Sequence, residues 1–544
     1  MCLSTLNRYL LTDEFLGSEP KFAEPTARPS GAVLRIAAKL VSDPNNSTLH
    51  ARRLGIDTYQ EHVVYMHHDC VVCRTEGFEA QSRIEMSLRG RRIVATLNVV
   101  MSDLLRTGEA GLSEAAWRAL QASEGDVIVL RHAPTLDSFS HVRAKVYGHT
   151  LDGVAFNAII ADVAAGRYSD LHLSSFISSC AGNRLNLEET IALTRAMVVV
   201  GERLIWGDGT VVDKHCVGGL PGNRTTMIVV PIVAACGLMM PKTSSRAITS
   251  PAGTADTMET LAPVDLDLAA MQRVVERTGA CIVWGGSVRL SPADDVLIRV
   301  ERPLDLDSEG LLVSSVLSKK VAAGSTHVLI DIPVGPTAKV RSTEAAQALG
   351  RRLIDVGKAV GLQVSLAITD GSQPVGRGVG PALEARDVLA VLRREPAAPS
   401  DLRERALRLA GDVLELGGAA SAGMGKVRAR EVLNDGRAWA KFQQICEAQG
   451  GLREPPSARY RHAVLADRAG VVNSIDNRVL ARAAKLAGAP KMAAAGLEVH
   501  ARIGDSVAPD QPVFTLHATT PGELAYALEY VNTHKAIFDI AQAS

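Results

Sequence analysis

The sequence predicts a multidomain α/β protein, and three observations lead to this prediction. The chain has 544 residues, which is too long for one compact core and favours roughly three to four domains. Apolar and polar residues alternate with a period of two through residues 32–100, which indicates β-strands. From Gly201 onward, strand-like and helix-like runs alternate, which is typical of a mainly parallel sheet with ligand loops at the carboxyl ends of its strands.

Changes of pattern along the chain separate a tail and four larger parts. The prolines of Pro396–Pro399 mark one boundary, and the first residues lack the apolar stretch and cleavage site of a secretory signal. We predict a loose tail over 1–29, an N-terminal β-rich domain over 30–132, a helical lobe over 133–202, an α/β lobe over 203–395 and a C-terminal α+β domain over 400–544.

Periodicity and capping signals predict the individual elements. Ser169 or Asp170 caps one helix, and Asn186 with Glu189 three residues on has the spacing of a capping box. The expected helices are 113–122, 151–165, 187–204, 343–360, 401–416 and 428–446, and the expected later strands lie near 127 and at 281–285, 328–334 and 364–370. Short strands with Gly-Asp turns follow residue 461 and indicate a compact α+β ending.

The longest apolar run, 227–241, is too short to span a bilayer and contains a proline and a glycine, so it predicts a buried helix and no membrane partner. Lys and Arg number 59, as do Asp and Glu, and no basic excess points to nucleic acid as a partner. The eight cysteines are scattered in contexts typical of free thiols, which fits a reducing, cytoplasmic compartment.

One cysteine pair is close in sequence, within the segment H-H-D-C-V-V-C. Together, His67, Cys70 and Cys73 have the residue types of half a zinc or redox site. However, no second C-x-x-C follows at a useful distance, and the valine-rich flanks indicate a strand. We therefore expect a strand that carries two thiols, and no metal.

The most informative stretch is 212–261, which contains two loops rich in glycine and hydroxyl residues. Each loop leads into the start of an expected helix, where unpaired backbone N–H groups and the helix dipole favour anions. The loops also carry full positive charges at Lys214, Arg224, Lys242 and Arg246. Two such loops separated by one buried element predict a site for phosphate or a phosphorylated sugar, and the lobe 203–395 is therefore expected to be the phosphate-binding lobe.

These residues also have purely structural interpretations. One structural interpretation is that Lys214 lies in a buried turn and pairs with Asp213. Another is that His215 only packs against its neighbours. The glycines beside them, and threonines that open an apolar helix, favour phosphate contact. In the second loop, the hydroxyl residues are either turn and cap residues or ligands of an anion beside Arg246, and their density favours ligands.

Two further segments remain open. The lysines that end S-S-V-L-S-K-K, residues 314–320, are either solvated helix residues or part of the site. Gly376, Gly378 and Gly380 do not fit the dinucleotide pattern G-x-G-x-x-G, and we interpret them as a glycine-rich active-site or hinge loop.

Taken together, the motifs D-K-H-x-x-G-G, P-I-V-A-A-C-G, S-S-R before G-T-A-D, and S-x-L-S-K-K resemble the thymidine and pyrimidine-nucleoside phosphorylases. The resemblance covers nearly everything after about residue 85. Cys216 replaces the usual hydroxyl residue, and the loop L-P-G-N-R-T-T is longer. In these departures the chain resembles the branch (type 2) that includes archaeal AMP phosphorylases and bacterial proteins described as thymidine phosphorylases. The segment S-S-R-A-I-T-S-P-A-G-T and the extended N-terminal domain are also similar to that branch.

The resemblance implies phosphorolysis, in which phosphate attacks C1′ and displaces the base: thymidine and phosphate give thymine and 2-deoxyribose 1-phosphate. It implies catalytic roles for Lys214, His215 and Asp307, the last as proton donor. It implies substrate or phosphate contacts by Gly219, Thr226, Ser244, Ser245, Arg246, Ala247, Ile248, Thr249, Ser250, Thr254, Ser315 and Lys339. Inorganic phosphate is a co-substrate, no metal or organic cofactor is required, lobe closure completes the site, and the expected partner is a second copy of the chain in a homodimer or larger homo-oligomer.

Three alternatives remain. One is AMP phosphorylase activity, which gives adenine and ribose 1,5-bisphosphate. The positive charges of Arg224, Arg246 and Lys339 favour it, because a 5′-phosphate needs extra positive partners. Cys216 also favours it, since it lacks the hydroxyl that thymidine enzymes use. A magnesium-dependent phosphoribosyltransferase of the same fold is another, and the absence of a clear acidic pair beside a diphosphate loop weighs against it. A non-catalytic binding protein is the last.

Overall fold

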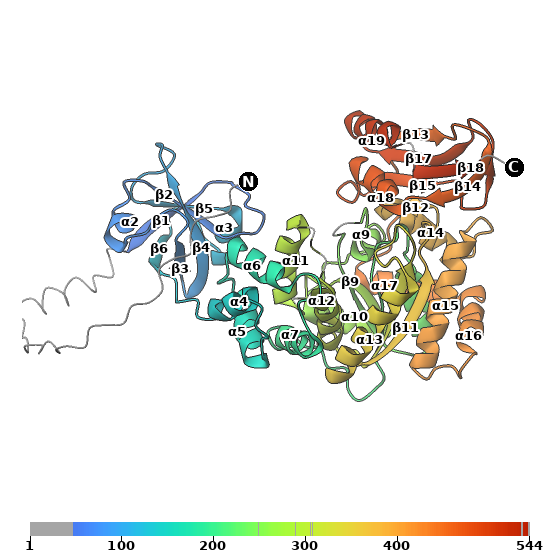
Figure 1. Ribbon diagram of the computed structural model, residues 1–544, viewed down its shortest axis with the longest axis horizontal. Helices are drawn as coiled ribbons and strands as arrows, with labels where there is room; N and C mark the ends of the chain where they lie inside the picture. Colours follow the sequence, from blue (N-terminus) through green and yellow to red (C-terminus); the bar gives the residue numbers. More distant parts are fainter. Residues whose placement is uncertain are drawn as a thin grey trace, which may run out of the picture. The chain divides into compact units, whose positions relative to one another are not determined.

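The computed structural model describes residues 47–541 apart from 248–249, 289, 305, 307 and 535–536, and it does not describe the side chain of residue 302. Within the chain, contacts divide residues 1–134 from residues 135–544 (Figure 1). The predicted tail over 1–29 lies outside the described residues. The mixed α/β character with several sheets is confirmed.

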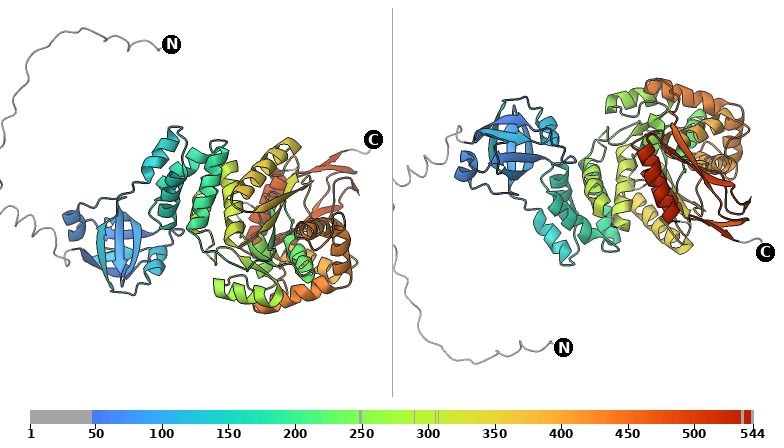
Figure 2. Two further views of the ribbon diagram at one scale, coloured as in Figure 1. Left: turned by 90° about the horizontal axis from the view of Figure 1, so that it is seen from below. Right: turned by 90° about the horizontal axis from the view of Figure 1, so that it is seen from above.

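The first unit contains a closed six-stranded barrel, visible from two further directions in Figure 2. Its strand order is β1-β5-β2-β4-β3-β6, and the strands are β1 (Thr48–Arg53), β2 (Val63–His67), β3 (Arg83–Leu88), β4 (Arg91–Val100), β5 (Glu109–Leu112) and β6 (Val127–His132). Alternate residues of β3 are buried, as the period of two requires when one face of a strand lines a core. Helix α3 (Glu114–Leu120) begins at Ser113, whose side chain accepts a hydrogen bond from the backbone of Ala116.

The segment H-H-D-C-V-V-C is not the strand that we expected. Strand β2 ends at His67, Cys70 is the N-cap of the short helix α2 (Val71–Glu76), and Cys73 lies inside that helix. Gly77 ends the helix in the left-handed conformation, with φ of 68°. The valines indicated a strand, but the glycine cap permits one helical turn in which Val72 and Cys73 are buried.

In the second unit, a helical lobe contains α4 (Phe139–Val146), α5 (Gly153–Ala164), α6 (Asp170–Cys180) and α7 (Leu187–Val199). Both expected capping signals are confirmed, because Ser169 begins α6 and Asn186 with Glu189 forms a reciprocal capping box before α7. Helix α7 ends five residues earlier than expected. A side chain at Gly201 would lie 2.1 Å from the carbonyl oxygen of Leu290, so the chain leaves the helix there.

The expected lobe boundary is wrong for α11 (Pro292–Leu304) and α12 (Glu309–Ala322), which the predicted range 203–395 assigns to the α/β lobe. Leu297 and Leu311 of these helices share one buried core with Phe156 and Ile177 of α5 and α6. The chain thus returns to the helical lobe after the first strands of the sheet, a long-range contact that local patterns do not reveal.

The α/β lobe is built on parallel strands. Strands β7 (Val212–Cys216), β10 (His327–Val334) and β11 (Gln363–Asp370) form one sheet in the order β11-β10-β7, and β8 (Met240–Ser244) pairs with β9 (Ala280–Trp284). A parallel bridge between Val211 and Met239 joins the two groups. The apolar run 227–241 is not one helix: α8 (Thr226–Ala235) ends before Gly237, whose φ is 91°, and β8 follows.

Helices surround this sheet: α9 (Thr254–Glu259), α10 (Leu268–Thr278), α13 (Thr343–Ala359), α14 (Pro381–Arg393), α15 (Ser400–Leu416), α16 (Gly425–Asn434) and α17 (Arg437–Gln449). The expected boundary at residue 400 is wrong, because Leu407 and Phe442 pack in the same core as Met227 of α8. The expected single helix 428–446 is two helices, separated by Gly436 at φ of 90°.

The C-terminal domain follows α17. It contains β13 (Tyr460–Leu465), β14 (Gly470–Ile475), α18 (Asn477–Leu486), β15 (Gly496–Val499), β16 (Ser506–Val507), β17 (Pro512–Ala518), α19 (Pro521–Thr533) and β18 (Phe538–Ala541). Its first sheet has the order β12-β15-β17-β13, in which β12 (Gly378–Val379) comes from the glycine-rich segment of the α/β lobe. Among the residues that the structure describes, no helix is long and apolar enough to cross a membrane.

Candidate active site

Two loops leave the carboxyl ends of neighbouring strands. The first loop, residues 217–225, connects β7 with α8, and the second loop, residues 245–253, connects β8 with α9. The first loop needs glycine, since Gly219 has a φ of 80° and a side chain there would lie 2.6 Å from the backbone nitrogen of Lys339. Each loop thus ends at the N-terminus of a helix, as the anion-site prediction requires.

Lys214 lies at the base of the first loop and has no exposed surface. Its Nζ donates a hydrogen bond of 2.9 Å to Thr225 Oγ1 and lies 3.5 Å from Asp331 Oδ2. Asp331 also accepts hydrogen bonds from Thr369 and Asn223. Burial raises the pKa of Asp331, but Lys214 and the hydrogen bonds outweigh it and hold the pKa below its usual value. The carboxylate of Asp331 is therefore charged.

A second ionic cluster surrounds Asp213, which precedes Lys214. Because neighbouring residues of a strand point to opposite faces, Asp213 and Lys214 belong to different clusters. The carboxylate of Asp213 lies 3.1 Å from Lys242 Nζ and 2.6 Å from Lys320 Nζ. Two buried lysines thus share one carboxylate. Burial lowers the pKa of Lys242 to about 7, and the repulsion of Lys320 adds to that effect while Asp213 opposes it.

The lysines of α12 are not solvated helix residues. Lys320 is 2% exposed, and Lys319 forms an ion pair of 2.5 Å with Asp294. Burial lowers the pKa of Lys319, but Asp294 and its neighbour Asp295 outweigh burial and raise it. His215 lies near this group of lysines. Burial, followed by the charges of Lys320 and other lysines, holds its pKa well below its usual value, so the imidazole is neutral.

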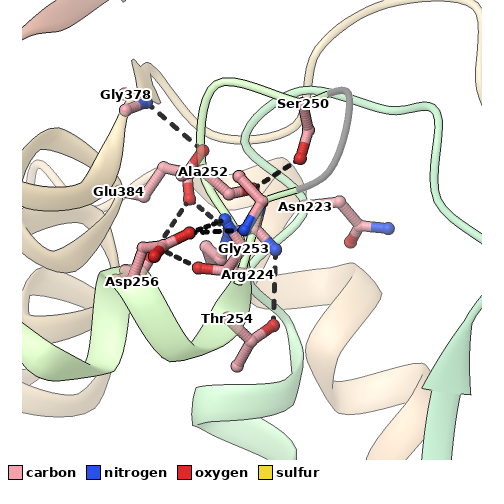
Figure 3. A network of polar contacts seen from close by, with 12 residues as sticks. Asn223, Arg224, Ser250, Ala252, Gly253, Thr254, Asp256, Gly378 and Glu384 are labelled. Atoms are coloured by element: carbon pink, nitrogen blue, oxygen red, sulfur yellow. Dashed lines mark hydrogen bonds and ion pairs between the residues drawn. The ribbon is translucent and has the colours of Figure 1, made fainter. Parts of the chain in front are cut away.

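Arg224 joins the two loops, as Figure 3 shows. Its guanidinium donates a hydrogen bond of 2.6 Å to the carbonyl oxygen of Ala252 and one of 3.4 Å to Thr254 Oγ1. On the other side, it pairs with Glu384 of α14, which is 1% exposed and also accepts a hydrogen bond from Thr257. The positive charge of Arg224 is therefore balanced by Glu384. The hydrogen bonds of its guanidinium hold the first loop against the second.

Arg246, in the second loop, is also paired. Both of its Nη atoms contact the carboxylate of Glu259, and its guanidinium lies 4.8 Å from the centre of the Trp284 ring. Asp256 fixes the same loop by accepting hydrogen bonds from the backbone nitrogens of Ala247 and Gly253. Hydrogen bonding to Glu259 raises the pKa of Arg246. Glu259 and Trp284 thus occupy the guanidinium of Arg246, which is not free to bind a phosphate.

The structure brings several expected residues to one edge of the sheet. Lys214, His215, Gly219 and Thr226 belong to β7, the first loop and α8, and Ser244 ends the neighbouring strand β8. The buried Ser244 Oγ has no hydrogen-bond partner among the described residues, as expected of a group that meets a ligand. Thr254 is the first residue of α9 and contacts Arg224.

The remaining expected residues differ in position. Ser245 is exposed, and Ser250 donates a hydrogen bond to the carbonyl oxygen of Ala252, which is a turn contact. Ser315 lies on α12, and Lys339 is exposed beside Gly219. Ile248, Thr249 and Asp307 lie outside the described residues. The N-cap of α12 is Ser308, whose side chain accepts a hydrogen bond from the backbone of Leu311.

Sequence reasoning missed the carboxylate partners of these cations, namely Asp331, Glu384, Asp256 and Glu259. One signal was present. The strand H-V-L-I-D-I-P-V contains a single carboxylate within an apolar run, and a carboxylate buried there needs a cation. Glu384 carried no comparable signal, because it lies on an amphipathic helix 160 residues after Arg224.

Three side chains in the barrel are close enough to hold a metal ion: one ligand atom each of His67, His68 and Asp69 lies within 4.8 Å of the others. Asp69 already contacts Arg74 and His68. Cys70 and Cys73, which sequence reasoning grouped with His67, do not belong to this group.

The chain matches two known protein families. The pattern of the glycosyl transferase family a/b domain matches residues 208–439, and the pattern of the pyrimidine nucleoside phosphorylase C-terminal domain matches residues 471–537. A protein of Acidovorax sp. (strain JS42) named "Putative thymidine phosphorylase 1" is 73% identical over 92% of this chain and 98% of that protein. The chain belongs to the thymidine and pyrimidine-nucleoside phosphorylase family. It is therefore a pentosyltransferase by family.

A more distant relative agrees with this result. A protein of Hahella chejuensis (strain KCTC 2396) named "Putative thymidine phosphorylase" is 59% identical, over 89% of this chain and 96% of that protein. Among solved structures, the anthranilate phosphoribosyltransferase (TrpD) of Thermus thermophilus has 19% sequence identity and a TM-score of 0.47, over 57% of this chain and 99% of that chain.

Proposed function

We propose that the protein cleaves the N-glycosidic bond of a pyrimidine nucleoside, with thymidine as the first candidate, by phosphorolysis. Family membership supports the reaction class. The observation that carries the assignment to this site is the pair of loops at the carboxyl edge of the sheet. Lys214 is buried at the base of the first loop, and Ser244 Oγ, which has no hydrogen-bond partner in the described part of the chain, lies at the base of the second. Such an edge collects backbone donors, hydroxyls and cations around one anion.

In the proposed reaction, an oxygen of phosphate forms a bond to C1′ while the bond from C1′ to the base nitrogen breaks. The electron pair of that bond moves onto the base, which takes up a proton or accepts a hydrogen bond. The loops hold the anionic nucleophile close to an oxocarbenium-like sugar, so that proximity and charge lower the barrier. The charges of Lys214 and of the Asp213 cluster are held in place before phosphate arrives, which avoids reorganisation during the reaction.

We assign the proton donor to Asp307 on the family resemblance, and this assignment remains a proposal. The test is Asp307→Asn, which keeps the size of the side chain but cannot deliver a proton. With AMP, the alternative substrate, we expect the variant to lose most cleavage and the alkaline limb of the pH profile, since a purine leaving group needs protonation. Cleavage of thymidine should fall less, because a thymine anion can leave with the help of hydrogen bonds alone. An unchanged pH profile would place the acid elsewhere. The metal-free reaction remains a proposal as well, and full turnover in the presence of a chelator would support it.

The alternative substrate is a nucleoside 5′-monophosphate such as AMP. The observation that favours it is the Asp213 cluster, in which Lys242 and Lys320 share one carboxylate and leave positive charge for a second anion. Against it, Arg224 and Arg246 are both neutralised by glutamates and are not free for a 5′-phosphate. We therefore favour the nucleoside.

One assay separates these possibilities. Thymidine, uridine, AMP, CMP and UMP are compared with and without inorganic phosphate, and free base is measured. Phosphate-dependent release of thymine with little release from the nucleotides supports the proposal. Release from the nucleotides alone favours the alternative, and no release from any substrate contradicts both.

Small-molecule nucleoside and phosphate are the expected partners of this family. We further propose a homodimer or larger homo-oligomer and no nucleic-acid partner, and measurement of the mass in solution tests the first point. A cytoplasmic location remains a prediction from the scattered cysteines; the seven in the described part of the chain are free thiols.

A further inference from the structure

The first loop lies between two backbone segments that come from later parts of the chain. On one side, a side chain at Gly219 would lie 2.6 Å from the backbone nitrogen of Lys339. On the other side, a side chain at Gly222 would lie 2.1 Å from the carbonyl oxygen of Val375, and the backbone nitrogen of Val375 donates a hydrogen bond of 3.1 Å to Pro221. The path of the first loop therefore depends on where residues 335–340 and 373–380 lie.

Arg502 of the C-terminal domain holds the segment 373–380. Its guanidinium donates a hydrogen bond of 2.5 Å to the carbonyl oxygen of Pro374 and another to that of Gly376, and it forms an ion pair of 3.2 Å with Asp401. The next residue, Ile503, donates its backbone N–H to the side chain of Gln373 at 2.9 Å. These contacts lie on either side of Val375, the residue that supports the first loop.

The same segment also becomes part of the C-terminal sheet. Strand β12 pairs with β15, with Gly378 opposite Glu498 and Val379 opposite Leu497. The backbone nitrogen of Val499 donates a hydrogen bond of 2.8 Å to Arg377. A main-chain ladder and a guanidinium therefore fix residues 373–380 to the C-terminal domain.

Asn477 holds the other segment. It is 1% exposed, its backbone nitrogen donates a hydrogen bond of 3.2 Å to Thr337 Oγ1, and its Nδ2 donates one of 3.0 Å to the carbonyl oxygen of Gly371. That carbonyl lies directly against Gly335, where a side chain would approach it to 2.3 Å. Residues 335–340, which carry Lys339 to the first loop, thus rest on the start of α18.

We infer that the C-terminal domain positions the phosphate-binding loop, and that Arg502 and Asn477 are the positioning residues. Neither residue touches the site. Each fixes one of the two backbone segments between which residues 217–225 are held, and the loop in turn presents its backbone N–H groups to the anion. This inference rests on the proposed function for the identity of the anion. The contacts that hold the loop do not depend on that function and can be tested without turnover.

The energetic consequence is preorganisation. A loop that is held in its binding conformation loses little conformational freedom when the anion binds, whereas a released loop must be ordered at that moment. Loss of the support should therefore weaken phosphate binding more than binding of the nucleoside, which also contacts the helical lobe by the family resemblance.

Amide hydrogen exchange on the full chain tests this directly. The variant is Arg502→Met, which keeps the length of the side chain and removes its donors. The matched control is Arg468→Met in the same domain, since Arg468 is 56% exposed and forms its ion pair with its neighbour Asp467. We expect the amides of residues 217–225 to exchange at least about tenfold faster in Arg502→Met, because one charged hydrogen bond alone corresponds to about that factor and the variant loses two. Arg468→Met should exchange like the wild type.

A second pair of measurements excludes a general loss of structure. Exchange of helix α13, residues 343–359, should remain unchanged in Arg502→Met, and Arg502→Lys, which keeps one donor group, should show an intermediate rate for the loop. Asn477→Ala should accelerate the loop in the same way. Where turnover is measured, the KM for phosphate should rise by about tenfold in Arg502→Met with a smaller change in the KM for the nucleoside.

Several results would overturn the inference: an unchanged exchange rate of residues 217–225, equal acceleration in the Arg468→Met control, or equal acceleration of α13. A wild-type protein that releases no base from any substrate would contradict the proposed function alone, because the exchange measurement needs no reaction.

Discussion

Lys214 and Asp331 form an ion pair of 3.5 Å in which neither side chain has any exposed surface. The pair joins strand β7, which leads into the first loop, to strand β10 at the centre of its sheet. A buried pair of this kind contributes little net stability by comparison with an apolar pair, but loss of one partner leaves an uncompensated charge. A change at Lys214 is therefore expected to affect both activity and folding.

We expect Lys214→Ala to lower the rate of phosphorolysis by about 100-fold or more, because a preorganised charge near the phosphate is lost. Because the variant leaves the buried carboxylate of Asp331 without its cation, the free energy of unfolding should also fall by roughly 3–5 kcal/mol. Denaturant unfolding and phosphate-dependent release of base measure the two effects.

The double variant Lys214→Ala with Asp331→Asn separates stability from catalysis. Removal of the second charge should recover most of the lost stability and none of the lost turnover. A folded Lys214→Ala protein with normal turnover would contradict the assignment of the phosphate to the first loop.

Arg246 gives a different prediction, because Glu259 and Trp284 already occupy its guanidinium. We expect Arg246→Ala to change the KM for a nucleoside and for its 5′-monophosphate by the same factor. Stability should fall by less than about 1 kcal/mol, since the pair is partly exposed and screened by solvent. Glu259→Ala serves as the matched variant and should behave alike. A selective rise in the KM for the nucleotide would instead show that Arg246 binds a 5′-phosphate, and would favour the AMP alternative.

Local signals predicted much of the fold. The capping residues Ser169 and Asn186 begin the helices that they were expected to begin, and the strands near 281, 328 and 364 are present as β9, β10 and β11. These features depend on a few adjacent residues, so the sequence contains them directly. The breaks at Gly237 and Gly436 were missed because an apolar or amphipathic run continues across each glycine.

For the candidate site, composition indicates which residues contact an anion, but it does not indicate the ion pairs that support them. Glycines, hydroxyls and lysines in 212–261 indicate an anion site by their composition. The ion pairs of Arg224 with Glu384 and of Lys320 with Asp213 join residues more than 100 positions apart, and no local pattern specifies them. For the same reason, the sequence shows the charges of Arg224 and Arg246 but not the carboxylates that balance them.

Lys242 predicts a pH dependence. Burial lowers the pKa of Lys242 to about 7, so its ammonium is present below that pH and is lost as the pH rises through it. Anion binding at the site should therefore weaken between about pH 6 and pH 9. Sulfate is the suitable probe, because phosphate titrates in the same range. We expect the wild-type Kd for sulfate to rise with pH and Lys242→Met to show a flatter profile.

The matched control for this prediction is Lys319→Met. Asp294 and Asp295 outweigh burial and raise the pKa of Lys319, so its charge persists through this range and its removal should leave the slope of the profile unchanged. If Lys242→Met retains the wild-type slope, the charge that titrates is not that of Lys242.

The pair of Arg224 and Glu384 offers a test of how the two loops act together. Arg224 contacts the second loop at Ala252 (Figure 3). Glu384 is buried and also accepts a hydrogen bond from Thr257 of α9. In a double-mutant cycle, Arg224→Met and Glu384→Gln should show an interaction energy of roughly 1–3 kcal/mol in unfolding, because each single change leaves the other group uncompensated.

Turnover should behave differently. Arg224→Met alone and the double variant should be equally slow, since both lose the hydrogen bond that holds the first loop against the second, whereas Glu384→Gln should retain more activity. A double variant that recovers wild-type turnover along with stability would show that the pair only balances charge, and that the loops do not need Arg224 to meet around the anion.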